Sequence, residues 1–217
     1  ETCAIMLEPV QGEGGVNVPS QSYLKQVREW CTEQNLVMIL DEVQTGIGRL
    51  GTLFGYESFG IEPDAITLAK GLGGGVPIGA FLAKDKFCLL APGDHGSTYG
   101  GNALTCAAAF AVVGHVVQND IATYARTIGQ HLFEGLKRIE SRHEFVTQVR
   151  GMGLLHAIQF NSDISAQVVS LCNKEGLLLN PVRPNAIRSM PPLTVTSQEV
   201  DLALERLDSA LSEVNFG

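Results

Sequence analysis

Up to about residue 90, the pattern of apolar and polar positions alternates between two kinds of segment. Unbroken apolar runs at 36–40 and 65–69 are typical of short strands buried on both faces. A helix is expected between Ser20 and Asn35, because apolar residues recur there at helical spacing. Its apolar face consists of Leu24, Val27 and Cys31. Alternating strands and helices predict an α/β fold built on a mostly parallel sheet.

Helical signals dominate the middle of the chain, and strands return after it. Asn102 is placed to cap a long alanine-rich helix, and a second helix is expected around 121–140. Residues 145–160 are expected to form two strands separated by a glycine pair, and residues 165–175 a further helix. Thr196-Ser-Gln-Glu199 is a capping box that opens a final helix, whose apolar stripe belongs to a core.

The composition changes near residue 117, where we place a domain boundary. Residues 1–117 are expected to form part of a large α/β domain, and residues 118–217 a small α+β domain. A chain of 217 residues is long enough for one large domain or two small ones.

Composition and charge exclude several classes of function. Hydrophobic residues make up 45% and charged residues 18% of the chain, which are globular values. The formal net charge of −8 argues against nucleic acid and against an anionic membrane as partners. The five cysteines include no Cys-x2-Cys pair and the five histidines show no ligand spacing, so we expect reduced thiols and no metal site. No apolar run approaches ~20 residues, so we expect no membrane span and a cytoplasmic protein.

Both apolar runs end in a charged residue. Asp41 follows the first run, and Lys70 follows the second. Because ligands of an open α/β sheet bind outside the carboxyl ends of its strands, a carboxylate and an amine would meet at the same edge. This pair suits pyridoxal 5'-phosphate (PLP), whose aldehyde forms a Schiff base with a lysine and whose pyridinium nitrogen pairs with an acid.

Two other interpretations of these runs remain open at this point. A lysine just past a strand is more often an exposed loop residue, because lysine is rarely buried. Four apolar residues before Asp41-Glu42 also resemble the Mg²⁺-binding strand of phosphate-cleaving ATPases. That interpretation requires Gly-x4-Gly-Lys-Ser/Thr, which this sequence lacks, since its glycines at 71–75 follow the lysine.

Five motifs occur in an order that points to a family. They are Leu7-Glu-Pro-Val-Gln-Gly-Glu-Gly-Gly15, Asp41-Glu-Val-Gln-Thr-Gly46, Ala69-Lys-Gly-Leu-Gly-Gly-Gly75, His95-Gly-Ser-Thr-Tyr-Gly-Gly-Asn102 and Ile187-Arg-Ser-Met-Pro-Pro-Leu193. The sequence resembles the class III (ω-amino) aminotransferases and, within them, the acetylornithine aminotransferases. The resemblance implies a PLP-dependent transferase of fold type I. It matches the C-terminal part of the large α/β domain and the small α+β domain.

The resemblance assigns cofactor contacts to several residues. Lys70 would hold PLP and serve as base and acid in the proton shift, while Asp41 keeps the ring nitrogen protonated. Val43 and Gln44 would lie against the ring and hydrogen-bond its phenolic oxygen. Glu42 is counted with this cofactor-binding segment, although a structural hydrogen bond is the role that its chemistry favours. In the family, Thr98 reaches the cofactor phosphate of the neighbouring subunit, which implies a homodimer with shared active sites.

Three further residues are assigned to the substrate. Arg188 would bind the α-carboxylate of an amino acid, because a guanidinium matches a carboxylate with two parallel bonds. Glu13 is expected to mask Arg188 when the substrate presents an amine there. Ser97 would lie near the substrate. Without the motifs, Arg188 would be assigned to a surface ion pair, and Glu13 and Ser97 to loop and turn positions.

The implied reaction transfers the δ-amino group of N2-acetylornithine to 2-oxoglutarate, as in arginine biosynthesis. Ornithine, 4-aminobutyrate and succinyldiaminopimelate aminotransferases are the alternatives, and Gln44 and Arg188 disfavour the related aminomutase of glutamate semialdehyde. The chain matches only the second half, or slightly more, of such enzymes. A fragment that does not catalyse is therefore a further alternative. We expect these residues alone to be inactive, because phosphate contacts, an aromatic ring partner and a second substrate arginine would lie upstream.

Overall fold

The chain divides into two units in a computed structural model that describes residues 1–216. The first unit contains Glu1–Val10 and Pro19–Ala122, and the second contains Gln11–Val18 and Thr123–Gly217. The division after Ala122 lies a few residues beyond the boundary expected near residue 117. The sequence analysis did not anticipate that the short segment Gln11–Val18 would join the second unit.

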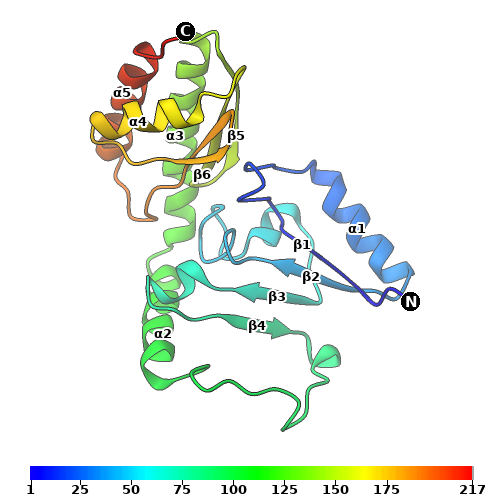
Figure 1. The fold of residues 1–217 in the computed structure, drawn as a ribbon. Coiled ribbons are helices and arrows are strands. Elements are labelled where there is room, and N and C mark those ends of the chain that lie inside the picture. The colour runs from blue at the N-terminus through cyan, green and yellow to red at the C-terminus, as the bar shows by residue number, and fades with distance from the viewer. Residues whose placement is uncertain (217) are drawn as a thin grey trace. The chain divides into compact units, whose positions relative to one another are not determined.

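The first unit is built on a four-stranded sheet with the order β1-β2-β3-β4 (Figure 1). Its strands are β1 (Ala4–Leu7), β2 (Val37–Asp41), β3 (Ala65–Leu68) and β4 (Ala80–Ala83). The first three strands are parallel, and β4 pairs with β3 in the antiparallel direction. In the register of β2 and β3, Asp41 lies opposite Thr67. The carboxyl ends of β2 and β3 therefore lie at the same edge.

Helices hold this sheet and its loops in place. Helix α1 (Gln21–Glu33) packs against β2 and buries Leu24 and Cys31. Helix α2 (Ala103–Gln118) begins at Asn102, whose side chain accepts a hydrogen bond of 3.1 Å from the Thr105 amide. Short 3-10 turns η1 (Gly55–Phe59), η2 (Lys70–Gly73) and η3 (Asp85–Phe87) complete the unit, and α2 packs against η2. The glycine-rich segment that begins at Lys70 therefore packs against a helix.

The second unit combines helices with an antiparallel sheet of order β5-β6-β8-β7. Its strands are β5 (Val146–Met152), β6 (Leu155–Phe160), β7 (Asn180–Arg183) and β8 (Ala186–Ser189). Its helices are α3 (Ile121–Arg142), α4 (Ser165–Lys174) and α5 (Ser197–Ser212). The core of the unit is apolar, with Leu136, Ile158, Phe160, Val168, Ile187 and Leu211 buried. The strands therefore present their side chains to a single core.

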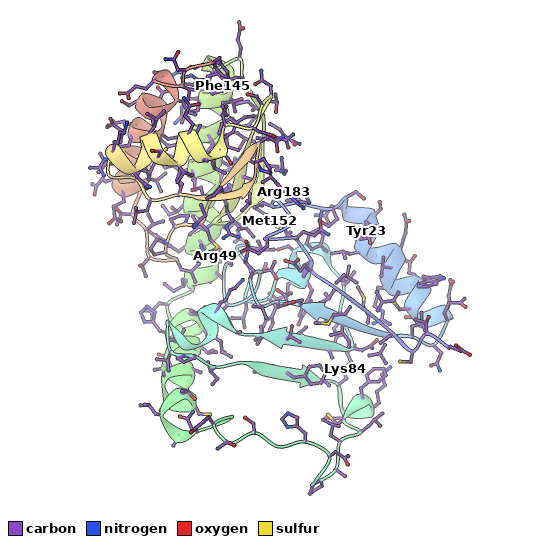
Figure 2. All side chains as sticks on the ribbon, in the orientation of Figure 1. Tyr23, Arg49, Lys84, Phe145, Met152 and Arg183 are labelled. Carbon is purple, nitrogen blue, oxygen red and sulfur yellow. The ribbon has the colours of Figure 1, made fainter. Side chains whose placement is uncertain are left out.

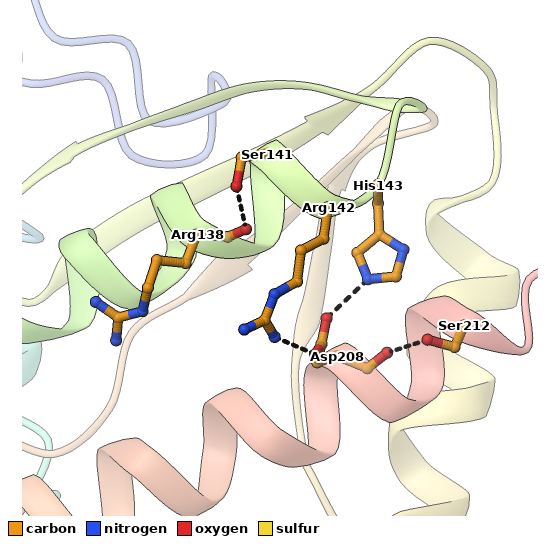
Figure 3. Close-up of polar contacts among 6 residues, drawn as sticks. All are labelled: Arg138, Ser141, Arg142, His143, Asp208 and Ser212. Atoms are coloured by element: carbon orange, nitrogen blue, oxygen red, sulfur yellow. Dashed lines mark hydrogen bonds and ion pairs between the residues drawn. The ribbon is translucent and has the colours of Figure 1, made fainter.

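A polar cluster ties α3 to α5 in this unit (Figure 3). Asp208 on α5 accepts hydrogen bonds from Arg142 at 2.6 Å and from His143 at 2.8 Å. Burial acts to raise the pKa of Asp208, but the bonds from His143 and Arg142 outweigh it and hold this pKa below its usual value. The cluster fastens the end of α3 and has no part in the chemistry argued below.

Most elements agree with the sequence analysis. The helices expected at Ser20–Asn35, after Asn102, around 121–140 and at 165–175 are present, and Thr196 and Glu199 form the predicted capping box. The strands before Asp41 and Lys70 and the glycine-separated pair at 145–160 are also confirmed. The sequence contains a further apolar run at 76–83, of which only the last four residues form a strand, β4. Strands β7 and β8 were not predicted.

Among the described residues, no single helix is long and apolar enough to cross a membrane. The helices α2 and α3 meet the length and composition criteria only when the two are taken together as one broken span.

Candidate active site

The carboxylate of Asp41 is fixed at the end of β2. Its Oδ1 atom accepts hydrogen bonds from the Val43 amide at 3.0 Å and from the Thr67 hydroxyl at 3.2 Å. Thr67 lies opposite Asp41 on β3, so the strand register itself supplies one of the two partners. Because both bonds are accepted by Oδ1, the other oxygen takes no hydrogen bond from the residues that the structure describes. Asp41 is therefore oriented and still able to meet a cationic group.

The neighbouring Glu42 anchors the loop that follows. Its side chain is 1% exposed and accepts hydrogen bonds from the Thr45 hydroxyl at 2.5 Å and from the Gly55 and Tyr56 amides, each at 2.8 Å. Burial raises the pKa of Glu42 above its usual value, against the effect of these bonds. A side chain at Gly55 would approach the Glu42 carboxylate to 2.9 Å. The carboxylate thus ties the glycine-rich loop back to the end of β2, and the contacts agree with the structural role that its chemistry favours.

Val43 and Gln44 continue from Asp41 into this loop. Val43 is half-buried, and the Gln44 side chain is buried. The loop turns at once, since the Gly46 amide donates to the Glu42 carbonyl at 2.9 Å. Gly46 has no room for a side chain, because a Cβ atom there would lie 2.9 Å from that carbonyl. The tight turn fixes where Val43 and Gln44 stand beside Asp41.

Lys70 has an unusual backbone. Its φ angle is +42°, a left-handed conformation that costs residues other than glycine about 1–3 kcal/mol. The conformation starts η2 directly after β3, and the Leu72 amide closes this turn on the Ala69 carbonyl at 2.9 Å. Strained backbone of this kind is concentrated at functional sites, so it gives Lys70 a significance beyond that of an ordinary loop lysine.

The Lys70 side chain is exposed and lines a cavity of about 620 Å³ within the first unit. The walls of the cavity come from three segments, Ala69–Lys70, Gly75–Gly79 and Tyr99–Gly101, together with Thr105 on α2. A cavity of this size lies in the range of small-molecule and cofactor sites. The Lys70 amine, which the sequence analysis predicts to be catalytic, therefore faces a cavity that can hold a ligand.

Ser97 and Thr98 lie immediately before the Tyr99–Gly101 wall of this cavity. Both are exposed, and the Ser97 hydroxyl accepts a hydrogen bond of 2.9 Å from the Gly100 amide. They precede the N-terminus of α2, where amide groups favour an anion. The cavity thus brings Lys70 together with the segment that directly follows Ser97 and Thr98, although β4 and η3 lie between them in the chain.

The predicted substrate pair lies in the second unit. Arg188, on β8, is 9% exposed, and its Nη1 atom donates to Glu13 Oε1 at 2.5 Å. The Glu13 side chain is 69% exposed on a turn of glycines. The two residues are 175 positions apart in the chain. The ion pair therefore joins a buried guanidinium to an exposed carboxylate. In this arrangement the Glu13 side chain could move away while Arg188 stays in place.

The comparisons with known proteins are consistent with one family. A family model described as "Aminotransferase class-III" matches residues 1–211. The chain is 48% identical to the acetylornithine aminotransferase of Caldanaerobacter subterraneus subsp. tengcongensis, over 100% of this chain and 55% of that relative. The chain belongs to the class III aminotransferase family. It spans about half the length of the curated relatives that it matches.

Solved structures of aminotransferases share the fold. The acetylornithine aminotransferase from Elizabethkingia anophelis matches with a TM-score of 0.93 and 36% identity, over 97% of this chain and 57% of that one. The ornithine aminotransferase from Toxoplasma gondii, described with partial occupancy of PLP at its active site, matches with a TM-score of 0.92 and 36% identity, over 96% of this chain and 50% of that one. These likenesses place the chain in the fold-type-I architecture of PLP-dependent aminotransferases.

The residues of the candidate site fit PLP. A cationic ring nitrogen needs a fixed carboxylate, and Asp41 is held through one oxygen with the other available. The aldehyde carbon needs an accessible amine, and Lys70 faces a cavity large enough for a small cofactor. Asp41 is the last residue of β2, and Lys70 lies just after β3, the neighbouring parallel strand. The donor set is therefore suited to a pyridine aldehyde.

Sequence reasoning missed residues that support the predicted ones. Thr67 was the only polar residue in its apolar run, and this could have marked it as a partner of Asp41. Arg150 and Arg183 hold the glycine turn that carries Glu13, through bonds to the Gly15 and Gly14 carbonyls. No local signal in this class III sequence reveals those contacts, because the partners are 135 and 169 positions apart.

Proposed function

We propose that this chain carries the catalytic lysine and the ring-binding aspartate of a PLP-dependent aminotransferase. One observation carries the proposal: Asp41 ends β2 and Lys70 lies just after the adjacent parallel strand β3, with Asp41 held by Thr67 and Lys70 lining a cavity. Membership of the class III family supports it. When bound, PLP supplies an electron sink that stabilises negative charge on the carbon next to the reacting nitrogen.

The residues of this chain would hold and move protons around that cofactor. Asp41 would keep the proton on the ring nitrogen, because a carboxylate at contact distance favours the charged form. The Lys70 amine would attach the cofactor and, once the substrate has displaced it, serve as the base and then the acid of the 1,3-proton shift. Val43 and Gln44 would contact the ring face and its phenolic oxygen, and Ser97 would lie near the substrate.

The substrate that the relatives suggest is N2-acetylornithine, with 2-oxoglutarate as amino acceptor and arginine biosynthesis as the context. The named curated relatives, at 41–48% identity, are acetylornithine aminotransferases. Ornithine is the second candidate, because solved ornithine aminotransferases match at TM-scores of 0.92 with 36–38% identity. We further propose a cytoplasmic homodimer in which Thr98 reaches the cofactor phosphate of the partner subunit.

A panel of amino donors tests the substrate. The PLP-loaded enzyme would be supplied with 2-oxoglutarate and, in turn, N2-acetylornithine, ornithine, 4-aminobutyrate or succinyldiaminopimelate, and glutamate formation measured. We expect kcat/KM for N2-acetylornithine to exceed each of the others by about tenfold or more, the factor that ~1.4 kcal/mol of differential binding provides. Preference for ornithine would move the assignment to the second candidate, and failure with every ω-amine would reject the proposed function.

Substitution of the Arg188–Glu13 pair should separate the two substrates. Arg188→Lys keeps the charge but loses the two-pronged geometry, so it should raise the KM for glutamate, whose carboxylate needs that geometry. It should also raise the KM for N2-acetylornithine, because a lysine pairs less well with the masking Glu13. Glu13→Gln removes the mask and should change the preference between them. Steady-state kinetics with each donor would measure both effects. Equal effects of Glu13→Gln on the two donors would contradict the masking role.

A further inference from the structure

The turn that carries Glu13 is held from outside by two arginines. It comprises Gly12–Gly15, and we call it the glycine turn. The backbones of Gln11 and Asn17 close its base through two hydrogen bonds of 3.1 and 3.0 Å. The segment Gln11–Val18, which contains the turn, belongs to the second unit, although the residues before and after this segment belong to the first. Contacts with strands β5, β7 and β8 therefore hold the glycine turn in the second unit.

Arg150, on β5, makes the stronger of these contacts. Its Nε and Nη2 atoms donate to the Gly15 carbonyl at 3.0 and 2.7 Å. Its Nη1 atom donates to Gln148 at 2.9 Å and to Gln159 at 2.6 Å, so the guanidinium is itself held in place. Both nitrogen atoms of one edge thus meet a single carbonyl of the glycine turn.

Arg183, at the end of β7, makes the second contact (labelled in Figure 2). Its Nε atom donates to the Gly14 carbonyl at 3.0 Å. The Asn17 side chain donates to the same carbonyl at 3.2 Å. Two successive carbonyls, directly after Glu13, are therefore bound by guanidinium groups from two strands, while Arg188 on a third strand binds the Glu13 side chain.

The backbone is strained directly after the glycine turn. Gly15 has a φ angle of +118° and Val16 one of +53°. A positive φ angle is a marked outlier for a β-branched residue such as valine and costs free energy. Val16 is fully buried, so the strain is maintained by its surroundings. Loss of the contacts that hold the carbonyls would let this segment relax.

We propose that Arg150 and Arg183 are positioning residues that set how readily Glu13 leaves Arg188. The inference rests on the proposed function and deepens it, because it concerns the choice between an ω-amine and glutamate at the same site. With the Gly14 and Gly15 carbonyls held, Glu13 returns to one place beside Arg188, although its side chain is exposed. The bonds from Arg150 to the Gly15 carbonyl and from Arg183 to the Gly14 carbonyl are called the backbone clamps. Together with the ion pair itself, they determine how often Arg188 is paired with Glu13 and how often it is free to bind a substrate carboxylate.

The clamps predict opposite effects on the two donors. If the glycine turn is released, Glu13 leaves Arg188 more often, and Arg188 is more available to the α-carboxylate of glutamate. The KM for glutamate should then fall. The KM for the ω-amine should rise, because an unmasked guanidinium faces the chain of a donor that brings no carboxylate to it. General loss of stability would instead impair both half-reactions in the same direction.

The test compares Arg150→Gln and Arg183→Gln with a matched control in the PLP-loaded enzyme. Arg206→Gln is the control, because Arg206 also donates to a glycine carbonyl, that of Gly176 at 2.9 Å, in the same unit but away from the glycine turn. Each half-reaction would be followed separately by cofactor absorbance, with glutamate or the ω-amine. We expect Arg150→Gln to change the ratio of the two kcat/KM values by about tenfold, with KM values moving in opposite directions. Arg206→Gln should leave the ratio within about twofold.

A second measurement does not depend on activity. The amides of Gln11, Val16 and Asn17 donate hydrogen bonds within or across the glycine turn, so their hydrogen exchange reports its opening. We expect faster exchange over 11–17 in Arg150→Gln and unchanged exchange there in Arg206→Gln. An unchanged exchange rate, or equal losses with both donors, would overturn the inference. A wild-type enzyme that accepts no ω-amine would overturn the proposed function, and the exchange comparison would still decide whether Arg150 holds the turn.

Discussion

Lys70→Ala should abolish amino transfer and prevent covalent attachment of the cofactor. Lys70 follows β3 in a strained left-handed conformation and lines the cavity, so no other lysine on the walls of that cavity can replace it. The loss should reach at least about ten-thousandfold in kcat, the upper end of what one positioned acid–base group contributes. A small primary amine added to the solution should restore a small part of the activity, because it can move the same proton.

Borohydride reduction identifies the attachment point directly. In the wild-type holoenzyme, which should be yellow, the reduced cofactor is expected on the peptide that contains Lys70. Lys84 is a matched control, because it follows β4 as Lys70 follows β3, and its amine lies 3.3 Å from Glu62. Lys84→Ala should leave labelling and turnover unchanged. Label on any peptide without Lys70 would refute the assignment.

The edge of the sheet could be predicted because its signals are local. An unbroken apolar run that ends in Asp41, and another that ends in Lys70, each contain the information for a buried strand and for the residue at its carboxyl end. Parallel pairing then brings the two ends together without further information. The same holds for the helix that Asn102 caps, since its cap and its apolar residues are adjacent in the chain.

The missed features depend on partners that are distant in the chain. Strand β7 has the sequence Asn180-Pro-Val-Arg183, which lacks a run or alternation of apolar residues, and it forms because β8 pairs with it. The left-handed backbone of Lys70 also has no signature, because such conformations are sparse for residues other than glycine. The contacts from Arg150 to Gly15 join residues 135 positions apart, and only the folded second unit reveals them.

Within the candidate site, too, the residues with local sequence signals could be predicted, whereas contacts between distant residues could not. Family motifs identified both Asp41 and Arg188, but the motifs do not state which residues hold them. Asp41 is held by Thr67 through strand register, a relation that sequence can suggest. Arg188 is paired with Glu13 through a turn whose position depends on two further arginines, a relation that needs the fold. The chemistry is therefore easier to predict from sequence than the support around it.

Asp41→Asn should leave the fold intact and remove most of the turnover. Asparagine has nearly the same shape, and its side-chain oxygen can still accept the bonds from Val43 and Thr67. It carries no negative charge, so it cannot stabilise a proton on the ring nitrogen. The loss should be several kcal/mol of transition-state stabilisation, or on the order of a thousandfold in rate. Rates measured at saturating cofactor, with thermal unfolding as a check on the fold, would test it.

Asp64→Asn is the control for Asp41→Asn, because Asp64 is expected to stabilise the fold and to take no part in the reaction. Burial acts to raise the pKa of Asp64, but hydrogen bonds from the Met38 amide at 2.8 Å and from Arg28 at 2.7 Å keep it below its usual value. Asp64→Asn leaves Arg28 without its partner charge, so it should lower the unfolding temperature while sparing the rate per folded molecule. Asp41→Asn should show the reverse pattern. A rate within about tenfold of wild type for Asp41→Asn, equivalent to ~1.4 kcal/mol or less, would mean that the ring proton is held by some other group.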